Sequence, residues 1–167
     1  IKKILITGVN SIGVDPIKTT LADLATYHLQ IRPGTNVAIL NMLAHYIIMD
    51  DLVDTNFIEL HTEKYEEFKS HVQNLNMDEL EKLTGVEKEL VRKAAHGYAS
   101  AENAMEFHGL GVTEHFQGSK TVMLLSNLAM MTGNIGRNGV GLNPLRGQNN
   151  VQGAADMGVQ PHQGAGY

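Results

Sequence analysis

The sequence predicts an α/β fold in which helices flank a mostly parallel sheet. Two short apolar runs, Ile4–Ile6 and Ile12–Val14, are bounded by glycine and asparagine and are typical of buried strands. Between residues 37 and 47, apolar residues recur at helical spacing, which predicts a helix with one buried face. A strand-like pattern returns at 105–111, and a helical pattern follows it at 122–130. Both element types therefore run along the chain.

Asp15 and Pro16 follow the second apolar run. Because proline cannot extend a central strand, we expect the strand to end there. An acid at the carboxyl end of a parallel strand stands where nucleotide-binding sheets place a ribose-binding carboxylate. On the residues alone, a turn or helix-cap role for Asp15 is the simpler interpretation.

The helix expected after Pro33-Gly34 can be capped by Thr35 or Asn36. Its central residues, Val37, Leu40, Leu43, Ala44 and Ile47, define the predicted buried face. His45 is interpreted as a packed or exposed helix histidine rather than a ligand.

Residues 50–100 read as helical scaffolding with little chemistry of their own. The charged residues of 59–69 are most simply a solvated face. Asn76 to Glu79 and Thr84 to Glu87 both fit the capping-box pattern. The second box predicts a helix that begins there and ends near Tyr98.

Gly109 and Gly111 supply two of the three glycines of a dinucleotide fingerprint, but Glu114 stands where the third would be. The stretch Gly118–Thr121 is not taken as a phosphate loop, because a serine separates its glycine from its lysine. The helix that follows is expected to stop at Gly133.

Three methionines in and just after that helix, Met123, Met130 and Met131, are interpreted as core filling rather than as part of a cofactor site.

The segment Gly139–Gly158 holds five of the 17 glycines and is rich in amide side chains. Arg146 and Asp156 are its charged residues. Glycines let the backbone approach another surface closely, and amides supply paired donors and acceptors. The segment therefore fits a pocket wall that aims one guanidinium at an anion. A glycine-rich surface loop is the alternative.

Composition restricts the classes of function. The 167-residue chain has a net charge of -5 without a basic stripe, which argues against nucleic acid as a partner. No apolar run approaches the roughly 20 residues that cross a bilayer, and the first residues do not form a signal peptide. With no cysteine and no local metal-binding motif among eight histidines, we expect no metal to be held by these residues.

The stretch NPLRGQNNVQGAADMG closely resembles the signature of molybdenum- or tungsten-dependent formate dehydrogenase catalytic (alpha) subunits of the molybdopterin oxidoreductase family. The resemblance extends to NLAMMTGNIGRNGVGLNP, GLGVTEHFQG and PHQGAGY, and more weakly to VDPIKTT and RPGTN. It implies an internal fragment of a larger multidomain enzyme with an αβα, Rossmann-like variant of the α/β fold. By this resemblance, residues 1–148 belong to a molybdopterin-guanine-dinucleotide-binding domain, and residues 149–167 begin the crossing into a neighbouring one.

The resemblance also implies the reaction, a two-electron oxidation of formate to CO2 at a bis-molybdopterin guanine dinucleotide centre with Mo or W. Arg146 would orient the formate carboxylate. The residues implied to line the cofactor are Asp15, Pro16, Gly34 and Asn36 at its guanosine end, Gly109, Leu110, Gly111, Glu114 and His115 at its pterin end, and Gly147 and Gln148. Three residues depart from the family pattern: Ile17 replaces an arginine, Leu110 a methionine and Glu114 a glutamine.

In the family, the metal is held by the cofactor's dithiolenes and by a cysteine or selenocysteine upstream of this stretch. The cysteines of a [4Fe-4S] cluster also lie upstream. We therefore expect electron-transfer subunits as partners, a cytoplasmic location, and no activity from the fragment alone. Another oxidoreductase of the family, such as a nitrate reductase, and a nonenzymatic nucleotide-binding piece are the alternatives.

Overall fold

The structure, a computed structural model, describes residues 7–162 and 164–165. The expected strand Ile4–Ile6 lies outside them. The elements are β1 (Ile12–Val14), α2 (Thr20–Leu24), β2 (Tyr27–Leu29), α3 (Asn36–Met49), α4 (Thr55–His61), α5 (Tyr65–Gln73), α6 (Met77–Thr84), α7 (Lys88–Ala99), β3 (Met105–His108), α8 (Leu110–Thr113), α9 (Gly118–Met131), β4 (Gly141–Pro144) and α10 (Val151–Asp156).

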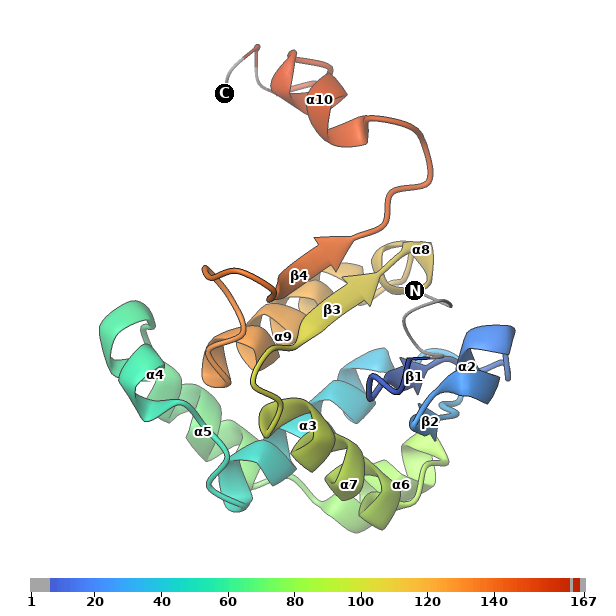
Figure 1. Ribbon diagram of the computed structural model, residues 1–167, viewed down its shortest axis with the longest axis vertical. Helices are drawn as coiled ribbons and strands as arrows, with labels where there is room; N and C mark the ends of the chain where they lie inside the picture. Colours follow the sequence, from blue (N-terminus) through green and yellow to red (C-terminus); the bar gives the residue numbers. More distant parts are fainter. Residues whose placement is uncertain (1–6, 163, 166–167) are drawn as a thin grey trace.

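The described strands form two small parallel sheets. β1 pairs with β2, and β3 pairs with β4. Each pair is joined by a helical crossover, as parallel strands require; in Figure 1, α9 lies behind β3 and β4. The predicted α/β class with parallel strands is confirmed, and the strands divide into two pairs instead of one sheet. The pattern analysis did not identify β2.

Helix α3 is the centre of the core, and α5, α6, α7 and α9 pack against it (Figure 1). Ile39, Met42 and Ile47 are fully buried. Ile39 and Met42 lie outside the predicted buried face, and Val37, which lies on it, is only partly buried. The predicted face is confirmed at Leu40, Leu43, Ala44 and Ile47. Burial extends beyond it, since neighbours on several sides require a helix that is apolar around most of its circumference.

Residues 50–100 are helical, as predicted, and the first capping box is confirmed. The Asn76 side chain accepts hydrogen bonds from the backbone N–H groups of Asp78 and Glu79, at 3.1 and 3.3 Å. The second box is wrong. Thr84 is the last residue of α6, and Gly85 ends that helix in a left-handed conformation with φ 76°. Helix α7 therefore begins only at Lys88.

The predictions for His45 and for the methionines of α9 can be compared with the structure. His45 is a packed helix histidine, as interpreted, because its Nδ1 makes a 3.0 Å hydrogen bond with the Val72 carbonyl oxygen. Met131 fills the core, whereas Met123 is exposed, so core filling was wrong for Met123. Among the described residues, no helix is long and apolar enough to span a bilayer.

Candidate active site

The strands β3 and β4 end at the same edge, which brings two glycine-containing segments together. His108 is paired with Pro144, and the Leu145 backbone N–H donates to the His108 carbonyl oxygen at 2.7 Å. The chain leaves both strands in the same direction because they are parallel. Gly109–Gly111 and Leu145–Gln148 therefore start side by side, where open α/β sheets bind their ligands.

Glycine at these positions permits a close approach between the two segments. A Cβ built on Gly147 would lie 3.3 Å from Leu110 Cδ1, and one on Gly109 would lie 3.6 Å from the Leu145 carbonyl oxygen. By contrast, no atom lies within 4 Å of a Cβ built on Gly111. The Gly111 backbone thus faces open space beside a tightly packed pair of loops.

Asn36 connects this edge to the first half of the chain. It is the first residue of α3, and its Nδ2 donates a 3.2 Å hydrogen bond to the Gly111 carbonyl oxygen. Gly34, with φ 85°, forms the turn that precedes the helix. The structure therefore brings Asn36 together with Gly111. By the family resemblance, these two residues are implied to lie at opposite ends of the cofactor.

Asp15 and Pro16 lie at the carboxyl ends of β1 and β2. Asp15 Oδ1 accepts a hydrogen bond from the Ile17 backbone N–H at 2.7 Å, which closes a local turn. The Pro16 carbonyl oxygen accepts from Gln30 Nε2 at 3.1 Å. This is the turn geometry expected from the residues alone, and it leaves Asp15 partly exposed. No recorded hydrogen bond of the described residues joins Asp15 to Gly109–Gly111.

Arg146 lies next to a buried histidine that the sequence analysis missed. His108 is only 8% exposed, and its Nδ1 has no hydrogen-bond partner among the described residues. Burial lowers the pKa of His108, and the positive charge of Arg146 lowers it further, against an opposing hydrogen bond with the Gly109 backbone. The lowered pKa favours the neutral form of the His108 ring. The exposed Arg146 is the cation at this edge.

The remaining predicted residues, Glu114, His115 and Gln148, are all exposed. Glu114 follows α8, and its backbone N–H donates to the Leu110 carbonyl oxygen at 2.9 Å. The His115 carbonyl oxygen accepts from the Gly118 N–H at 2.8 Å, which starts α9. The backbone thus fixes where Glu114 and His115 lie, and their side chains are free to meet a ligand.

A signal for His108 was present in the sequence. Met105, Glu106, Phe107 and His108 alternate between apolar and polar side chains. Alternation places Glu106 and His108 on one face of a strand. The unexpected feature is that the polar face is the covered one, with His108 buried and Glu106 partly buried, while Met105 and Phe107 are exposed.

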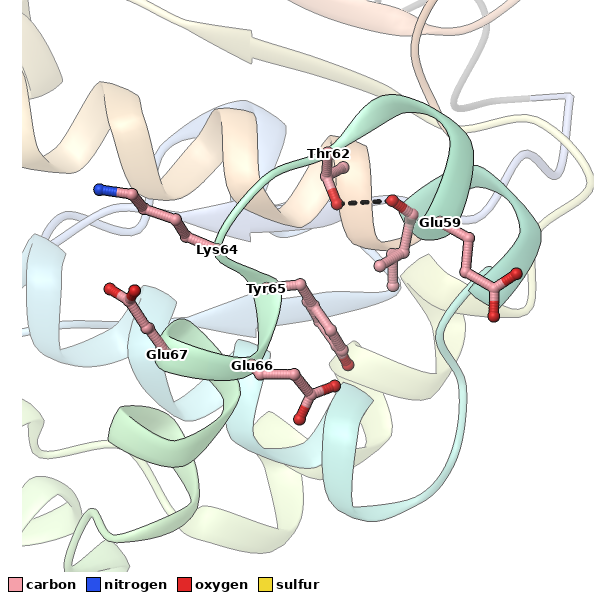
Figure 2. A pocket seen from close by; sticks show the side chains of 7 residues that line it. Glu59, Thr62, Lys64, Tyr65, Glu66 and Glu67 are labelled. Carbon is pink, nitrogen blue, oxygen red and sulfur yellow. Dashed lines mark hydrogen bonds between the residues drawn. The ribbon is translucent and has the colours of Figure 1, made fainter.

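Two surface hollows lie elsewhere. One, of about 380 Å³, lies between α4 and α5 and is lined by charged side chains including Glu59, Lys64 and Glu67. Figure 2 shows these side chains pointing in different directions, without converging on one point. The other, of about 560 Å³, lies along α7 beside Arg92 and His96. Among the described residues, no group of His, Asp and Glu side chains is arranged to hold a metal ion.

The chain also resembles proteins of known families. The profile of the family described as molybdopterin oxidoreductase matches residues 3–165. The chain is 45% identical to the F420-dependent formate dehydrogenase subunit alpha of Methanocaldococcus jannaschii and 43% identical to formate dehydrogenase H of Escherichia coli. Each match covers 96% of this chain but only 24% and 22% of those proteins.

Two more distant relatives extend the comparison. The catalytic subunit of the Bacillus subtilis assimilatory nitrate reductase is 34% identical over 96% of this chain and 22% of its own length. The solved structure of acetylene hydratase from Pelobacter acetylenicus superimposes with a TM-score of 0.75 and 27% identity, over 83% of this chain and 19% of that one. The chain thus spans about a quarter or less of the length of the proteins it matches.

Proposed function

The chain belongs to the molybdopterin oxidoreductase family, and from that premise we propose that it is part of the catalytic alpha subunit of a formate dehydrogenase. The observation that carries the proposal is the meeting of two segments at one sheet edge. Arg146 and Gly147 leave β4 beside Gly109–Gly111, which leave β3. Similarity to formate dehydrogenase alpha subunits supports formate as the substrate.

The described residues fit a large anionic cofactor at this edge. Gly111 offers an open backbone, and His108 Nδ1 is a buried ring nitrogen without a partner among the described residues. Arg146 supplies a positive charge beside them. A bis-molybdopterin guanine dinucleotide with Mo or W would accept the two electrons of the reaction when bound. We propose that Gly109, Leu110, Gly111, Glu114, His115, Gly147 and Gln148 line its pterin end, and that Asp15, Pro16, Gly34 and Asn36 line its guanosine end.

Arg146 is proposed to bind the formate carboxylate. A guanidinium presents two parallel N–H donors, which fix both the distance and the plane of a carboxylate. The single C–H bond of formate then has a defined direction. Positioning and electrostatics are the contributions of these residues, because the redox chemistry belongs to the cofactor.

The rest of the proposal concerns the full-length protein. A [4Fe-4S] cluster held by other residues would carry the electrons onward to electron-transfer subunits. We assign residues 1–148 to one cofactor-binding domain and residues 149–167 to the start of the crossing into the next. A cytoplasmic location stays a prediction from the sequence.

Two measurements on the purified full-length protein test this function. The first is its content of Mo, W and pterin, and the second is its activity with formate and with nitrate. We expect bound metal and oxidation of formate, and no oxidation by residues 1–167 alone. Reduction of nitrate without oxidation of formate would contradict the substrate and favour the second candidate, which is supported by similarity to the nitrate reductase subunit. Absence of both metal and pterin would contradict the redox function itself.

A further inference from the structure

A row of buried and partly buried polar side chains lies behind β3. Glu106 and His108 share the covered face of the strand, and the Tyr98 hydroxyl of α7 donates a 2.5 Å hydrogen bond to Glu106 Oε1. Glu106 Oε2 and His108 Nδ1 are both buried without a hydrogen-bond partner among the described residues. Buried polar atoms rarely lack a hydrogen-bond partner, so Glu106 Oε2 and His108 Nδ1 are candidates for a functional role.

The row continues past Tyr98 toward the loop that precedes β3. Tyr98 also interacts with Thr132 and Asn134, which follow α9. The buried Asn134 donates to Thr132 Oγ1 at 2.9 Å and accepts from the Ala104 backbone N–H at 3.0 Å. Polar groups thus extend along β3 from its carboxyl end, at the candidate active site, to the amino end of the same strand.

The surroundings of Glu106 are almost free of charge. Tyr98 faces it from α7, and Thr132 and Asn134 complete that side; from β4, the Asn143 side chain donates to the Glu106 backbone carbonyl at 3.2 Å. Burial raises the pKa of Glu106 to about 7, although the Tyr98 hydrogen bond opposes the rise. Arg137 is the cation at the far end, where its Nη2 donates to Asn134 Oδ1 at 3.4 Å.

We propose that Glu106 receives, through His108, the proton released when formate is oxidised at the edge of β3. This inference rests on the proposed function. Formate oxidation yields CO2, two electrons and one proton; the cofactor, when bound, would accept the two electrons. One ring nitrogen of His108 takes up the proton while the other gives a proton to the ionised Glu106 carboxylate.

The spacing of the groups suits this transfer. Residues two apart on a strand have Cα atoms about 6.7 Å apart and place their side chains on the same face, so in this proposal a water molecule bridges His108 and Glu106. A carboxyl group that titrates near neutral pH both accepts and releases protons readily.

The test compares variants of the full-length enzyme over a range of pH. For the unmutated enzyme, we expect kcat for formate oxidation to fall as pH drops through about 7, because protonated Glu106 cannot accept. Glu106→Gln should lower kcat at least about tenfold, a modest share of what proton transfer contributes, and remove this ionisation from the profile. Tyr98→Phe should move the midpoint to higher pH, since it removes a hydrogen bond that stabilises the carboxylate.

A matched control and a direct readout accompany these rates. Glu89→Gln changes an exposed glutamate of α7 and should leave the profile unchanged. The infrared carbonyl band of a protonated carboxylic acid near neutral pH should disappear in Glu106→Gln. Metal and pterin contents should equal those of the unmutated enzyme. A Glu106→Gln enzyme with the unmutated rate and pH profile would overturn the relay alone, whereas an unmutated enzyme that does not oxidise formate would overturn the proposed function as well.

Discussion

The Asn36 side-chain amide donates a 3.2 Å hydrogen bond to the carbonyl oxygen of Gly111, across 75 residues of sequence. This bond joins the start of α3 to the loop after β3. Within the described residues, this hydrogen bond connects the residues proposed for the guanosine end of the cofactor with those proposed for its pterin end. The position of the Gly109–Gly111 loop therefore depends on a residue near the start of the core helix.

Asn36→Ala should loosen the Gly109–Gly111 loop with little effect on the rest of the fold. The bond is exposed, so we expect a loss of about 0.5–1 kcal/mol in the free energy of unfolding. Faster amide hydrogen exchange should be confined to residues near 109–113. Asn56→Ala, at an exposed position of α4, is the control. Unchanged exchange in the Asn36 variant would contradict the role of this bond.

Glu106→Gln should become stabilising relative to the unmutated chain as pH rises. The pKa of Glu106 is raised from 4.5 to about 7 by burial. Folded protein then binds a proton that unfolded protein has lost, so the stability of the unmutated chain falls between pH 4.5 and about 7. A shift of this size corresponds to about 3 kcal/mol. Glutamine has no such ionisation.

Urea unfolding of both chains at pH 5 and pH 8 measures the effect. From pH 5 to pH 8, the free energy of unfolding of Glu106→Gln should increase relative to that of the unmutated chain by up to about 3 kcal/mol. Glu89→Gln should show no comparable change. A constant difference across pH would mean that Glu106 is not titrating in the folded chain.

Asp50 ties the end of α3 to α7, and its loss should destabilise that contact at neutral pH. Arg92 donates to both carboxylate oxygens, at 2.7 and 2.8 Å, and His96 Nε2 lies 2.7 Å from Oδ2. The hydrogen bond from Arg92, with His96 in support, holds the pKa of Asp50 below its usual range. Its stabilisation is therefore present above pH 4 and is lost as pH falls through the lowered pKa.

Because Arg92 is nearly half exposed, we expect Asp50→Asn to cost only about 1 kcal/mol. Thermal unfolding at pH 7 and at pH 3 measures this, and the difference from the unmutated chain should shrink at the lower pH. Asp51→Asn changes the neighbouring exposed acid and should stay within about 0.5 kcal/mol. Equal effects of the two variants would mean that the ion pair contributes nothing.

The sequence predicted those elements whose signals are local. The strand Ile12–Val14, the start of α3 and the Asn76 cap each depend on a few neighbouring residues. The end of α6 was missed because the Thr84–Glu87 pattern fits a cap, while Gly85 can end a helix equally well.

Long-range packing decided the rest. β2 exists because it pairs with β1, and its three residues, Tyr27–Leu29, are too short a run to predict a strand alone. Resemblance to a family supplied the candidate site residues, but the Asn36–Gly111 bond and the burial of Glu106 and His108 depend on how α7, α9 and β4 pack. No local pattern predicts a buried polar face on β3, because burial is a property of the whole fold.

Gly111→Ala should separate folding from cofactor binding. A Cβ at this position meets no atom within 4 Å, so the free energy of unfolding of the chain should change by less than about 0.5 kcal/mol. In the full-length protein, the same methyl group would stand between the backbone and the proposed cofactor, so pterin content should fall. Gly164→Ala, which also meets no atom within 4 Å, is the control. Full pterin content in the Gly111 variant would exclude close approach of the cofactor there.

Arg146→Lys in the full-length enzyme should impair catalysis without removing the cofactor. Lysine keeps the positive charge but offers a flexible point donor, so formate would bind and be oriented poorly. We expect kcat/KM to fall at least about tenfold, equivalent to about 1.4 kcal/mol, with Mo or W content unchanged. Arg146→Ala should reduce it further, because the carboxylate then has no counter-charge. It should also raise the pKa of His108, which the arginine lowers.

Formate kinetics, metal analysis and NMR titration of the His108 ring test these expectations together, with the exposed Lys120→Ala of α9 as the control for loss of one positive charge. If Arg146 only braced the loop beside β4, both variants would lose metal and pterin together with activity. A lysine variant with near-normal kcat/KM would show that orientation of the carboxylate does not depend on the paired donors of a guanidinium. A normal kcat/KM in the alanine variant would remove Arg146 from the substrate site. The predicted order of activity, arginine above lysine above alanine at constant metal content, follows only if the guanidinium contacts formate itself.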